Sequence, residues 1–392
     1  MAIEKLRLNS KHLIAYLEGS EGLLFDTSRQ SLQFLNTSAL AHLFSLDELS
    51  SAASIDSYLS KYDPTDPSLI QLSGWLEPGI PDGDYINKMY PELTAGTFSG
   101  YGESVQSTAN SLSYLTVKVA NTITRIGLPA GARFDSCLKL FAPIATEEND
   151  PHFYFQCDKE EDEYSLTVNG HQVLRDLTEM QLLPEIIDRL QILAYQREGF
   201  SFCFHGAAFS YKQKEVLLPG VSGAGKSTLS MALSEYADDF YSDEFIVFEG
   251  DFGIKKLELP IALKPGSWGL IDEALNGDKS TRIWERLDGR HVKYIWPDTK
   301  KCFYHSSIQS AEGRETRLIM AFPQYTVGAN SNKRSLTVIE TLQKLVEGGY
   351  QVGTELSETI VDELLTLLVN AGKYELNYGS TGDAVRLLDE IG

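Results

Sequence analysis

The chain has 392 residues, of which 42% are hydrophobic and 23% are charged, and its formal net charge is −21. This length predicts two or three domains, and this composition is typical of a globular protein with a sizeable core. Because an acidic surface repels nucleic-acid phosphates and anionic membranes, we expect neither as a partner. We find no signal-peptide pattern at the start of the sequence and no window typical of a membrane span, so we expect a cytoplasmic protein.

The cysteines show no metal-binding or redox spacing. There are four of them, far apart in the sequence: Cys137, Cys157, Cys203 and Cys302. Since none lies in a CxxC pair, we expect reduced core or surface thiols and no zinc site.

Residues 1–62 are predicted to form a small module. Apolar and polar side chains alternate over residues 13–36 on both sides of the polar break DTSRQ, which predicts a β-hairpin. The stretches 37–46 and 54–62 predict short helices, the first beginning with candidate N-cap residues. Residues 63–111 are rich in Pro, Gly, Ser and Asp and keep little periodicity, so we expect a linker there.

Residues 112–392 are predicted to form an α/β domain with a mixed sheet. It begins with a β-rich region over residues 112–174, in which the Asn-Gly pair at 169–170 signals a hairpin. Apolar residues at helical spacing follow over residues 179–200. The polar turn KQKE then joins two apolar strands, and two further amphipathic helices are expected near the C-terminus.

The stretch LLPGVSGAGKSTLSMAL satisfies the phosphate-binding pattern G-x-x-x-x-G-K-[ST] with Gly220, Gly225, Lys226 and Ser227. Glycines let successive backbone N–H groups converge on one anion, and the following helix points its positive end at the same place. We expect Lys226 to reach the β- and γ-phosphates of ATP and Ser227 to ligate Mg²⁺. The remaining residues expected to contact the nucleotide are Ser222, Gly223, Ala224 and Thr228.

Two adjacent acids, Asp243 and Glu244, follow the helix of this motif and open the apolar stretch FIVFE. The spacing from Lys226 is enough for one helix and a turn, so the carboxylates are predicted to return beside the phosphates. One can accept a proton from an attacking hydroxyl while the other holds Mg²⁺. An acidic turn that only caps a strand is the alternative, and the pair at 238–239 is a rival acidic site.

His205 lies in an apolar strand and is followed by Gly206. That strand should pair with the one that enters the phosphate motif, which would place His205 near the terminal phosphate. The glycine would permit a close backbone approach. A core histidine with satisfied hydrogen bonds is the alternative.

The segments FHGAAFS, VLLPGVSGAGKSTLSMAL and FYSDEFIVFE together resemble the HPr kinase/phosphorylase family and its HPr-kinase-related members. Their catalytic core is similar to that of phosphoenolpyruvate carboxykinase. The segment LPIALKPGSW, with Lys264 and Ser267, is similar to a later block, and the resemblance covers roughly residues 112–392. It implies ATP- and Mg²⁺-dependent phosphoryl transfer to a hydroxyl, with Asp243 as the base or a metal ligand, Lys264 near the nucleotide, and an oligomer.

The sequence departs from the family pattern in two places. Glu244 stands where the family has a second aspartate. The Arg-Gly signature that the bifunctional enzymes use for phosphorolysis is not found, since Arg282, Arg286 and Arg290 are patterned differently. The resemblance therefore implies a kinase more than a phosphorylase.

The stretch GLLFDTSRQSLQFLNTSALAHLFSL resembles the PqqD-like fold, a winged-helix-like module that binds a leader peptide by adding its strand to a sheet edge. A small docking or dimerisation domain is the alternative. The combined expectation is a kinase that phosphorylates a Ser/Thr-like hydroxyl of a peptide or protein. Two other functions stay open: a kinase of a small hydroxylated metabolite such as an amino acid or sugar, and a nucleotide-binding regulator without turnover.

Overall fold

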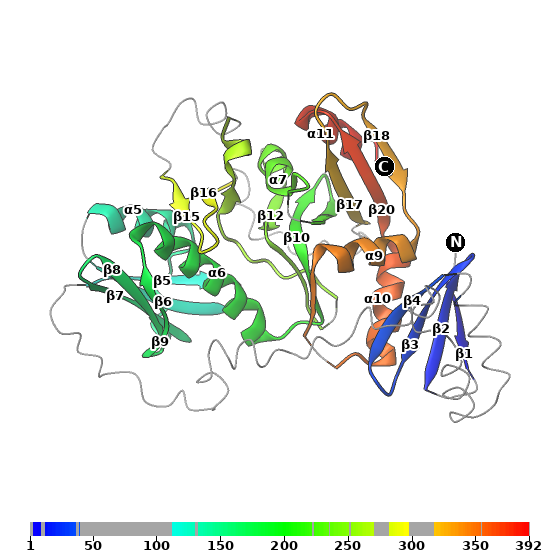
Figure 1. The fold of residues 1–392 in the computed structure, drawn as a ribbon, viewed down its shortest axis with the longest axis horizontal. Helices are drawn as coiled ribbons and strands as arrows, with labels where there is room; N and C mark the ends of the chain where they lie inside the picture. The colour runs from blue at the N-terminus through cyan, green and yellow to red at the C-terminus, as the bar shows by residue number, and fades with distance from the viewer. Residues whose placement is uncertain are drawn as a thin grey trace.

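The computed structural model describes residues 3–8, 12–36, 39, 112–129, 132–221, 223–234, 236–250, 252–269, 282–297, 317–353 and 355–391. Apart from Ala39, the helices expected within residues 37–62 lie outside the described residues, as do the expected linker, Ser222 and Cys302. The described chain is a mixed α/β protein built on several sheets (Figure 1).

A central eight-stranded sheet carries the motifs found in the sequence. Its order is β12-β10-β11-β17-β20-β18, and β13 and β19 pair with the first half of β10. The strands are β10 (Phe202–Tyr211), β11 (Lys214–Pro219), β12 (Asp239–Ser242), β13 (Phe245–Phe248), β17 (Arg317–Tyr325), β18 (Asn332–Ser335), β19 (Tyr350–Val352) and β20 (Gly372–Tyr378). Only β11, β17 and β20 run parallel among the described strands of this sheet, so it is mixed, as predicted.

Helices cover both faces of the central sheet. They are α7 (Lys226–Ser234), α9 (Val338–Gly348), α10 (Glu358–Asn370) and α11 (Thr381–Asp389). Successive side chains of a strand point to opposite faces. Val216 and Leu218 of β11 accordingly join the apolar cluster of α7 and α11, whereas Leu217 joins that of α9 and α10. The sheet therefore has two hydrophobic cores, and the glycine-rich motif leaves it at the end of β11.

The β-rich region predicted from the sequence is a second sheet, in the order β5-β6-β7-β8-β9. Its elements are β5 (Leu112–Val119), β6 (Thr122–Pro129), α5 (Ala132–Leu140), η2 (Ala142–Ile144), β7 (Phe153–Glu160), β8 (Glu163–Val168), β9 (His171–Leu177) and α6 (Glu179–Glu198). Asn169 and Gly170 both have positive φ angles, which confirms the predicted hairpin turn. Buried Cys137 and Cys157 belong to the core of this region.

A small third sheet lies between these two. It consists of β14 (Ile261–Leu263), β15 (Trp284–Glu285) and β16 (His291–Ile295), and the turn η3 (Pro265–Ser267) follows β14. The residues between β15 and β16 form a tight turn, in which the amide of Arg286 donates to the carbonyl of Arg290 and the amide of Gly289 donates to the carbonyl of Arg286.

The N-terminal residues form an antiparallel four-stranded sheet, called the first sheet below. Its strands are β1 (Glu4–Arg7), β2 (Leu13–Glu18), β3 (Glu21–Asp26) and β4 (Ser31–Leu35). The sequence predicted one hairpin with its turn at DTSRQ. The structure corrects this, because a second turn at Gly19 (φ 66°) and Ser20 divides the predicted first strand, and the short charged β1 adds another strand.

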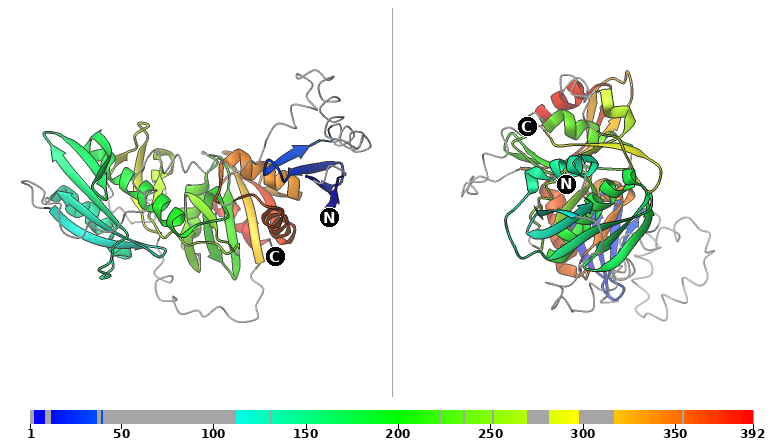
Figure 2. Two further views of the ribbon diagram at one scale, coloured as in Figure 1. Left: turned by 90° about the horizontal axis from the view of Figure 1, so that it is seen from below. Right: turned by 90° about the vertical axis from the view of Figure 1, so that its left-hand side faces the viewer.

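The first sheet packs against α9 and α10, at the opposite end of the molecule from the β-rich region (Figure 2). Its buried side chains belong to the same apolar cluster as the two helices: Ile14, Tyr16, Leu23, Phe25 and Leu32. The hydroxyl of Tyr16 also donates to Asp362 of α10 at 2.8 Å. The first sheet thus shares a core with the central sheet and its helices.

Candidate functional site

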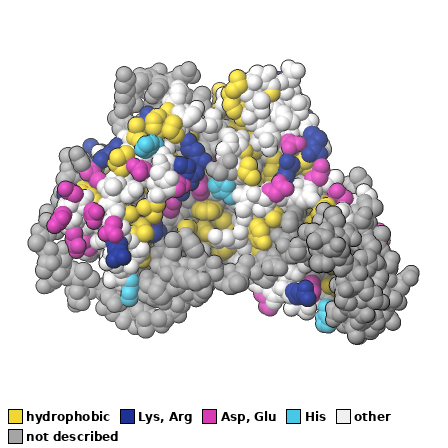
Figure 3. Space-filling view, viewed as in Figure 1, with side chains coloured by type: hydrophobic (Ala, Val, Ile, Leu, Met, Phe, Trp, Pro, Cys, Tyr) yellow, Lys and Arg dark blue, Asp and Glu magenta, His cyan; other side chains and the backbone are white. Residues whose placement is uncertain are grey.

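A cavity of about 330 Å³ opens where β11 ends and brings together residues that lie far apart in the sequence. Nine predicted site residues line it: His205, Gly223, Gly225, Lys226, Ser227, Thr228, Asp243, Glu244 and Lys264. It is also lined by Ala262, Ser267, Arg286, Arg290 and Val292. Of the other predicted residues, Gly220 and Ala224 belong to the adjoining loop without lining the cavity. In Figure 3, Lys, Arg, acidic and His side chains gather near the centre of the face shown.

The glycine-rich loop, residues 220–225, joins β11 to α7 as the sequence predicted. Gly220, Gly223 and Gly225 have φ angles of 146°, 93° and 91°, which residues other than glycine rarely adopt. The ammonium group of Lys226 donates hydrogen bonds to the carbonyl oxygens of Gly220 (2.7 Å) and Val221 (2.9 Å). Burial lowers the pKa of Lys226 to about 8, although Glu244 and Asp243 act in the opposite direction.

Gly206 brings β10 close to the strand that enters the loop. A Cβ atom at this position would lie 2.7 Å from the carbonyl oxygen of Leu218 and 2.8 Å from Cα of Pro219, so only glycine fits. The amide of Gly206 also donates to the carbonyl of Glu244 at 3.0 Å. The predicted close backbone approach is present, and it holds the acidic pair beside the loop.

His205 lines the cavity from β10. Its amide donates to the carbonyl of Gly349 at 3.0 Å, its carbonyl accepts from the amide of Gly220 at 3.3 Å, and its Nδ1 lies 3.9 Å from Oε1 of Glu244. Burial lowers the pKa of His205, and the charge of Glu244 raises it in part. At neutral pH the imidazole is therefore neutral, and it lies in the same cavity as the glycine-rich loop.

Asp243 and Glu244 occupy the bend between β12 and β13. Asp243 is 7% exposed, and neither of its carboxylate oxygens has a hydrogen-bond partner among the described residues. Burial, followed by the charge of Glu244, raises the pKa of Asp243 to about 7, while the nearby hydroxyls of Ser227 and Ser230 lower it in part without completing a hydrogen bond. A buried carboxylate with two unused oxygens is suited to take a proton or a cation.

The donor atoms around Asp243 fit a magnesium ion. Asp243, Glu244 and Ser227 are among the residues that line the cavity, and carboxylate and hydroxyl oxygens are the hard ligands that Mg²⁺ prefers. The rival pair at 238–239 does not line the cavity, and Asp239 forms an ion pair with Lys256. Asp243, Glu244 and Ser227 are therefore the residues that could hold the metal beside a nucleotide.

The segment that follows β14 closes the side of the cavity next to α7. The hydroxyls of Thr228 and Ser267 share a 2.5 Å hydrogen bond, and Lys264 lines the cavity just before η3. Lys264 and Ser267 of the LKPGS segment are thus brought beside the first turn of α7.

Sequence reasoning missed Arg286, Arg290 and Asp188. The two arginines line the cavity from the turn between β15 and β16, and Arg286 donates a 2.6 Å hydrogen bond to Asp188 of α6. Burial raises the pKa of Asp188 to about 6, Glu244 raises it further, and Arg286 opposes this shift. The available signal for Asp188 was its charged side chain, which lies in a helix whose residues are mostly buried.

Helix α6 also supports the acidic bend from behind. The amide group of Gln191 donates to the hydroxyl of Ser242 at 3.4 Å, and the same hydroxyl accepts from the amide of Phe245 at 3.2 Å. The β-rich region therefore contributes positioning contacts to the site through one helix.

No protein-family model matches this chain, and no significant match is found among curated proteins. In the part of the chain that the structure describes, none of the helices is both long and apolar enough to cross a membrane.

Proposed function

We propose that the protein is an ATP-dependent kinase with an HPr-kinase-like phosphate-binding core, and that it transfers the γ-phosphoryl group to a Ser/Thr-like hydroxyl of a peptide or protein. One observation carries this proposal. A glycine-rich loop with its lysine and a buried aspartate with a pKa of about 7 line the same cavity. A kinase needs both parts, a cradle for the phosphates and a base for the acceptor hydroxyl.

The residues on the phosphate side would bind and orient the nucleotide. Backbone N–H groups of the glycine-rich loop and the positive end of α7 attract phosphate oxygens, and Lys226 adds a charge inside the loop. His205, neutral at pH 7, donates a hydrogen bond to the terminal phosphate. Mg²⁺, when bound, would be held by oxygens of Ser227 and Glu244 and would neutralise phosphate charge, which leaves Asp243 for the proton.

The acceptor side requires a base. Asp243 takes the proton of the acceptor hydroxyl while the hydroxyl oxygen bonds to the γ-phosphorus. The bond from that phosphorus to the β,γ-bridging oxygen breaks, and ADP leaves with the electron pair. A pKa near 7 suits a base that works at neutral pH, and Arg286 and Arg290, which line the same cavity, would stabilise the negative charge of the transferring group.

A peptide acceptor is favoured by the first sheet. Among its described strands, β1 and β4 are the edges, and an extended peptide can add to such an edge as a further strand. The PqqD-like resemblance of residues 22–46 points to the same binding mode. A small hydroxylated metabolite is the second candidate, favoured by the cavity volume of about 330 Å³, which lies in the range of small-molecule sites.

The test uses the full chain, labelled ATP and two acceptor panels, one of Ser/Thr-containing peptides and one of free hydroxylated amino acids and sugars. Transfer to peptides by the wild type, with none by Lys226→Ala, supports the proposal. Transfer to free metabolites alone supports the second candidate. Tight ATP binding without transfer to any acceptor would indicate a regulator and reject both. Deletion of the first sheet does not separate the candidates, because it would expose the core shared with α9 and α10.

A further inference from the structure

We propose that Glu18 is a positioning residue for the nucleotide site, and that it couples the docking of the first sheet to the glycine-rich loop through helix α9. The inference rests on the proposed function only in taking ATP as the ligand of the loop. Glu18 lies at the end of β2, more than 200 residues from the loop in sequence, and does not line the cavity.

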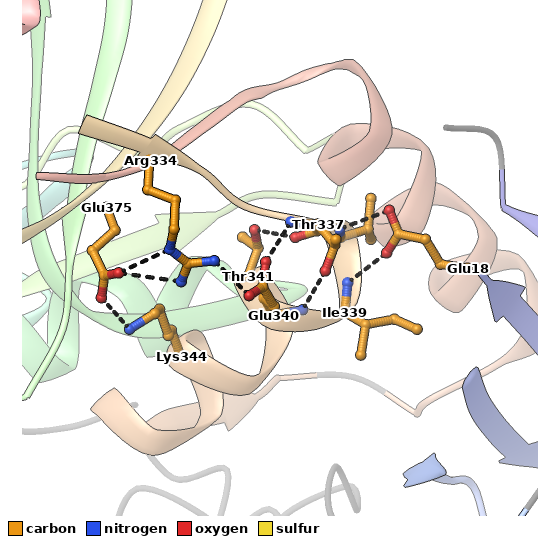
Figure 4. Close-up of polar contacts among 9 residues, drawn as sticks. Glu18, Arg334, Thr337, Ile339, Glu340, Thr341, Lys344 and Glu375 are labelled. Carbon is orange, nitrogen blue, oxygen red and sulfur yellow. Dashed lines mark hydrogen bonds and ion pairs between the residues drawn. The ribbon is translucent and has the colours of Figure 1, made fainter. Parts of the chain in front are cut away.

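Glu18 holds the N-terminal end of α9. Its side chain is buried, with the residue 8% exposed, and its two carboxylate oxygens accept hydrogen bonds from the amides of Val338 (3.1 Å) and Ile339 (3.0 Å) (Figure 4). These are the first two amides of the helix, which have no acceptor within the helix itself. The negative charge also complements the positive end of the helix dipole.

The local sequence of α9 leaves these two amides to Glu18. Thr337 and Glu340 form a capping box, in which the hydroxyl of Thr337 accepts from the amide of Glu340 and the carboxylate of Glu340 accepts from the amide of Thr337. The amides of Val338 and Ile339 are not part of this exchange. The end of the helix is therefore completed by a side chain from the first sheet.

The C-terminal end of α9 contacts the site. A Cβ atom on Gly348 would lie 3.3 Å from Cα and from the carbonyl carbon of Gly220, so the two backbones are in direct contact. The carbonyl of the next residue, Gly349, accepts the 3.0 Å hydrogen bond from the amide of His205. The 11 residues of α9 span roughly 16 Å between Glu18 and the glycine-rich loop.

The flank of α9 is tied to the central sheet by charged side chains. Arg334 of β18 binds both Glu340 and Glu375, and Lys344 of α9 donates to Glu375 of β20 at 2.8 Å (Figure 4). The apolar face of α9 lies in the core shared by the first sheet and the central sheet. A displacement of the first sheet, such as one caused by a bound peptide, is therefore passed along a helix that is held at both ends. By linkage, the binding of ATP must affect the first sheet in return.

The test compares Glu18→Gln with Tyr16→Phe in the full chain. Glu18→Gln keeps the side-chain size and removes the charge at α9. Tyr16→Phe is the matched control, because it removes one hydrogen bond of the same sheet to α10, which does not line the cavity. The readouts are the melting temperature, the ATP dissociation constant by calorimetry, and hydrogen exchange of residues 220–228 without nucleotide.

We expect Glu18→Gln to raise the ATP dissociation constant roughly fivefold or more and to speed exchange at the loop at temperatures where the protein is folded. Tyr16→Phe should lower the melting temperature and leave both other readouts unchanged. Equal behaviour of the two variants, with lower melting temperatures only, would show that Glu18 is merely structural and would overturn the inference. If the wild type binds no ATP, the proposed function fails, and the exchange comparison still decides the coupling.

Discussion

Arg286 donates a 2.6 Å hydrogen bond to Asp188, and this contact joins a helix of the β-rich region to the turn that faces the glycine-rich loop. The pair is largely buried, with side-chain exposures of 18% and 27%. Arg286 lines the cavity, whereas Asp188 does not; Asp188 reaches the site by holding Arg286 and by its position near Glu244, with which it lines a small adjoining pocket. The pair therefore offers a way to perturb the site without changing the glycine-rich loop.

We expect Asp188→Asn to lower kcat/KM for the acceptor by about tenfold, equivalent to about 1.4 kcal/mol, and to leave ATP binding unchanged. In the wild type the same loss should develop as the pH falls through about 6, where Asp188 becomes protonated. Steady-state kinetics with both substrates varied measures this. Asp288→Asn is the control, because Asp288 pairs with Arg290 in the same turn but is 48% exposed, and such pairs contribute little. Equal effects of both substitutions would contradict a positioning role for Asp188.

The second prediction concerns catalysis by Asp243. Asp243→Asn removes the carboxylate that we propose as the base and should lower kcat by roughly 10²- to 10⁴-fold. In the wild type, kcat/KM should rise with pH through about 7, because only the ionised carboxylate accepts a proton. Phosphoryl transfer measured from pH 5 to 9 tests both points. A flat profile, or an Asn variant with wild-type activity, would assign the base to another group.

The third prediction concerns how the buried carboxyl group of Asp243 lowers the free energy of unfolding. The pKa of Asp243 is about 7 in the folded protein, above the value near 3.9 in the unfolded chain, so the unfolded state loses its proton first as the pH rises. The contribution of Asp243 to the free energy of unfolding should therefore fall between about pH 4 and pH 7 and stay low above it. Asp243→Asn removes this cost, on the order of 3–4 kcal/mol at pH 8 and much less at pH 5. Denaturant unfolding at the two pH values measures it, and an Asn variant that is no more stable than wild type at pH 8 would refute the burial argument.

The fourth prediction concerns Gly206. A methyl group there meets backbone atoms of Leu218 and Pro219 at 2.7–2.8 Å, and backbone atoms cannot move aside cheaply. We expect Gly206→Ala to lower the free energy of unfolding by about 1–3 kcal/mol and to weaken ATP binding, since the strand displaced is the one that enters the loop. Gly250→Ala serves as the control, because a Cβ atom added there would meet no other atom within 4 Å and its φ is not positive. Thermal unfolding and calorimetry with ATP distinguish the two variants.

The site was predictable where its residues are close in sequence or in neighbouring strands. The glycine pattern required a loop after β11, and the Asn169–Gly170 pair required a tight turn, because both depend on backbone conformations that few residues adopt. The sequence placed Asp243 beside the loop by a connection of one helix and a turn, whereas in the structure strand β12 also lies between α7 and the acidic bend. His205 was placed by the pairing of two consecutive strands.

The sequence was less informative wherever a contact joins distant segments. The sequence does not indicate the extra strands of the first sheet, because β1 has four residues and a charged composition, and because the alternating pattern continues through the Gly19–Ser20 turn. No feature of the α6 sequence indicates that Asp188 contacts Arg286, since the two residues lie 98 residues apart.

The sequence by itself determined which residues gather at the end of β11: those of the glycine-rich loop, the lysine at the start of α7 and the acids that return beside them. These features follow from local backbone freedom and short connections, which neighbouring residues specify. Only the tertiary structure decided that Arg286 is held by Asp188, and that Glu18 completes the helix that ends against Gly220. Such contacts depend on how separate sheets pack against each other. Packing brings together side chains that lie far apart in the sequence, and no local pattern indicates that they will be in contact.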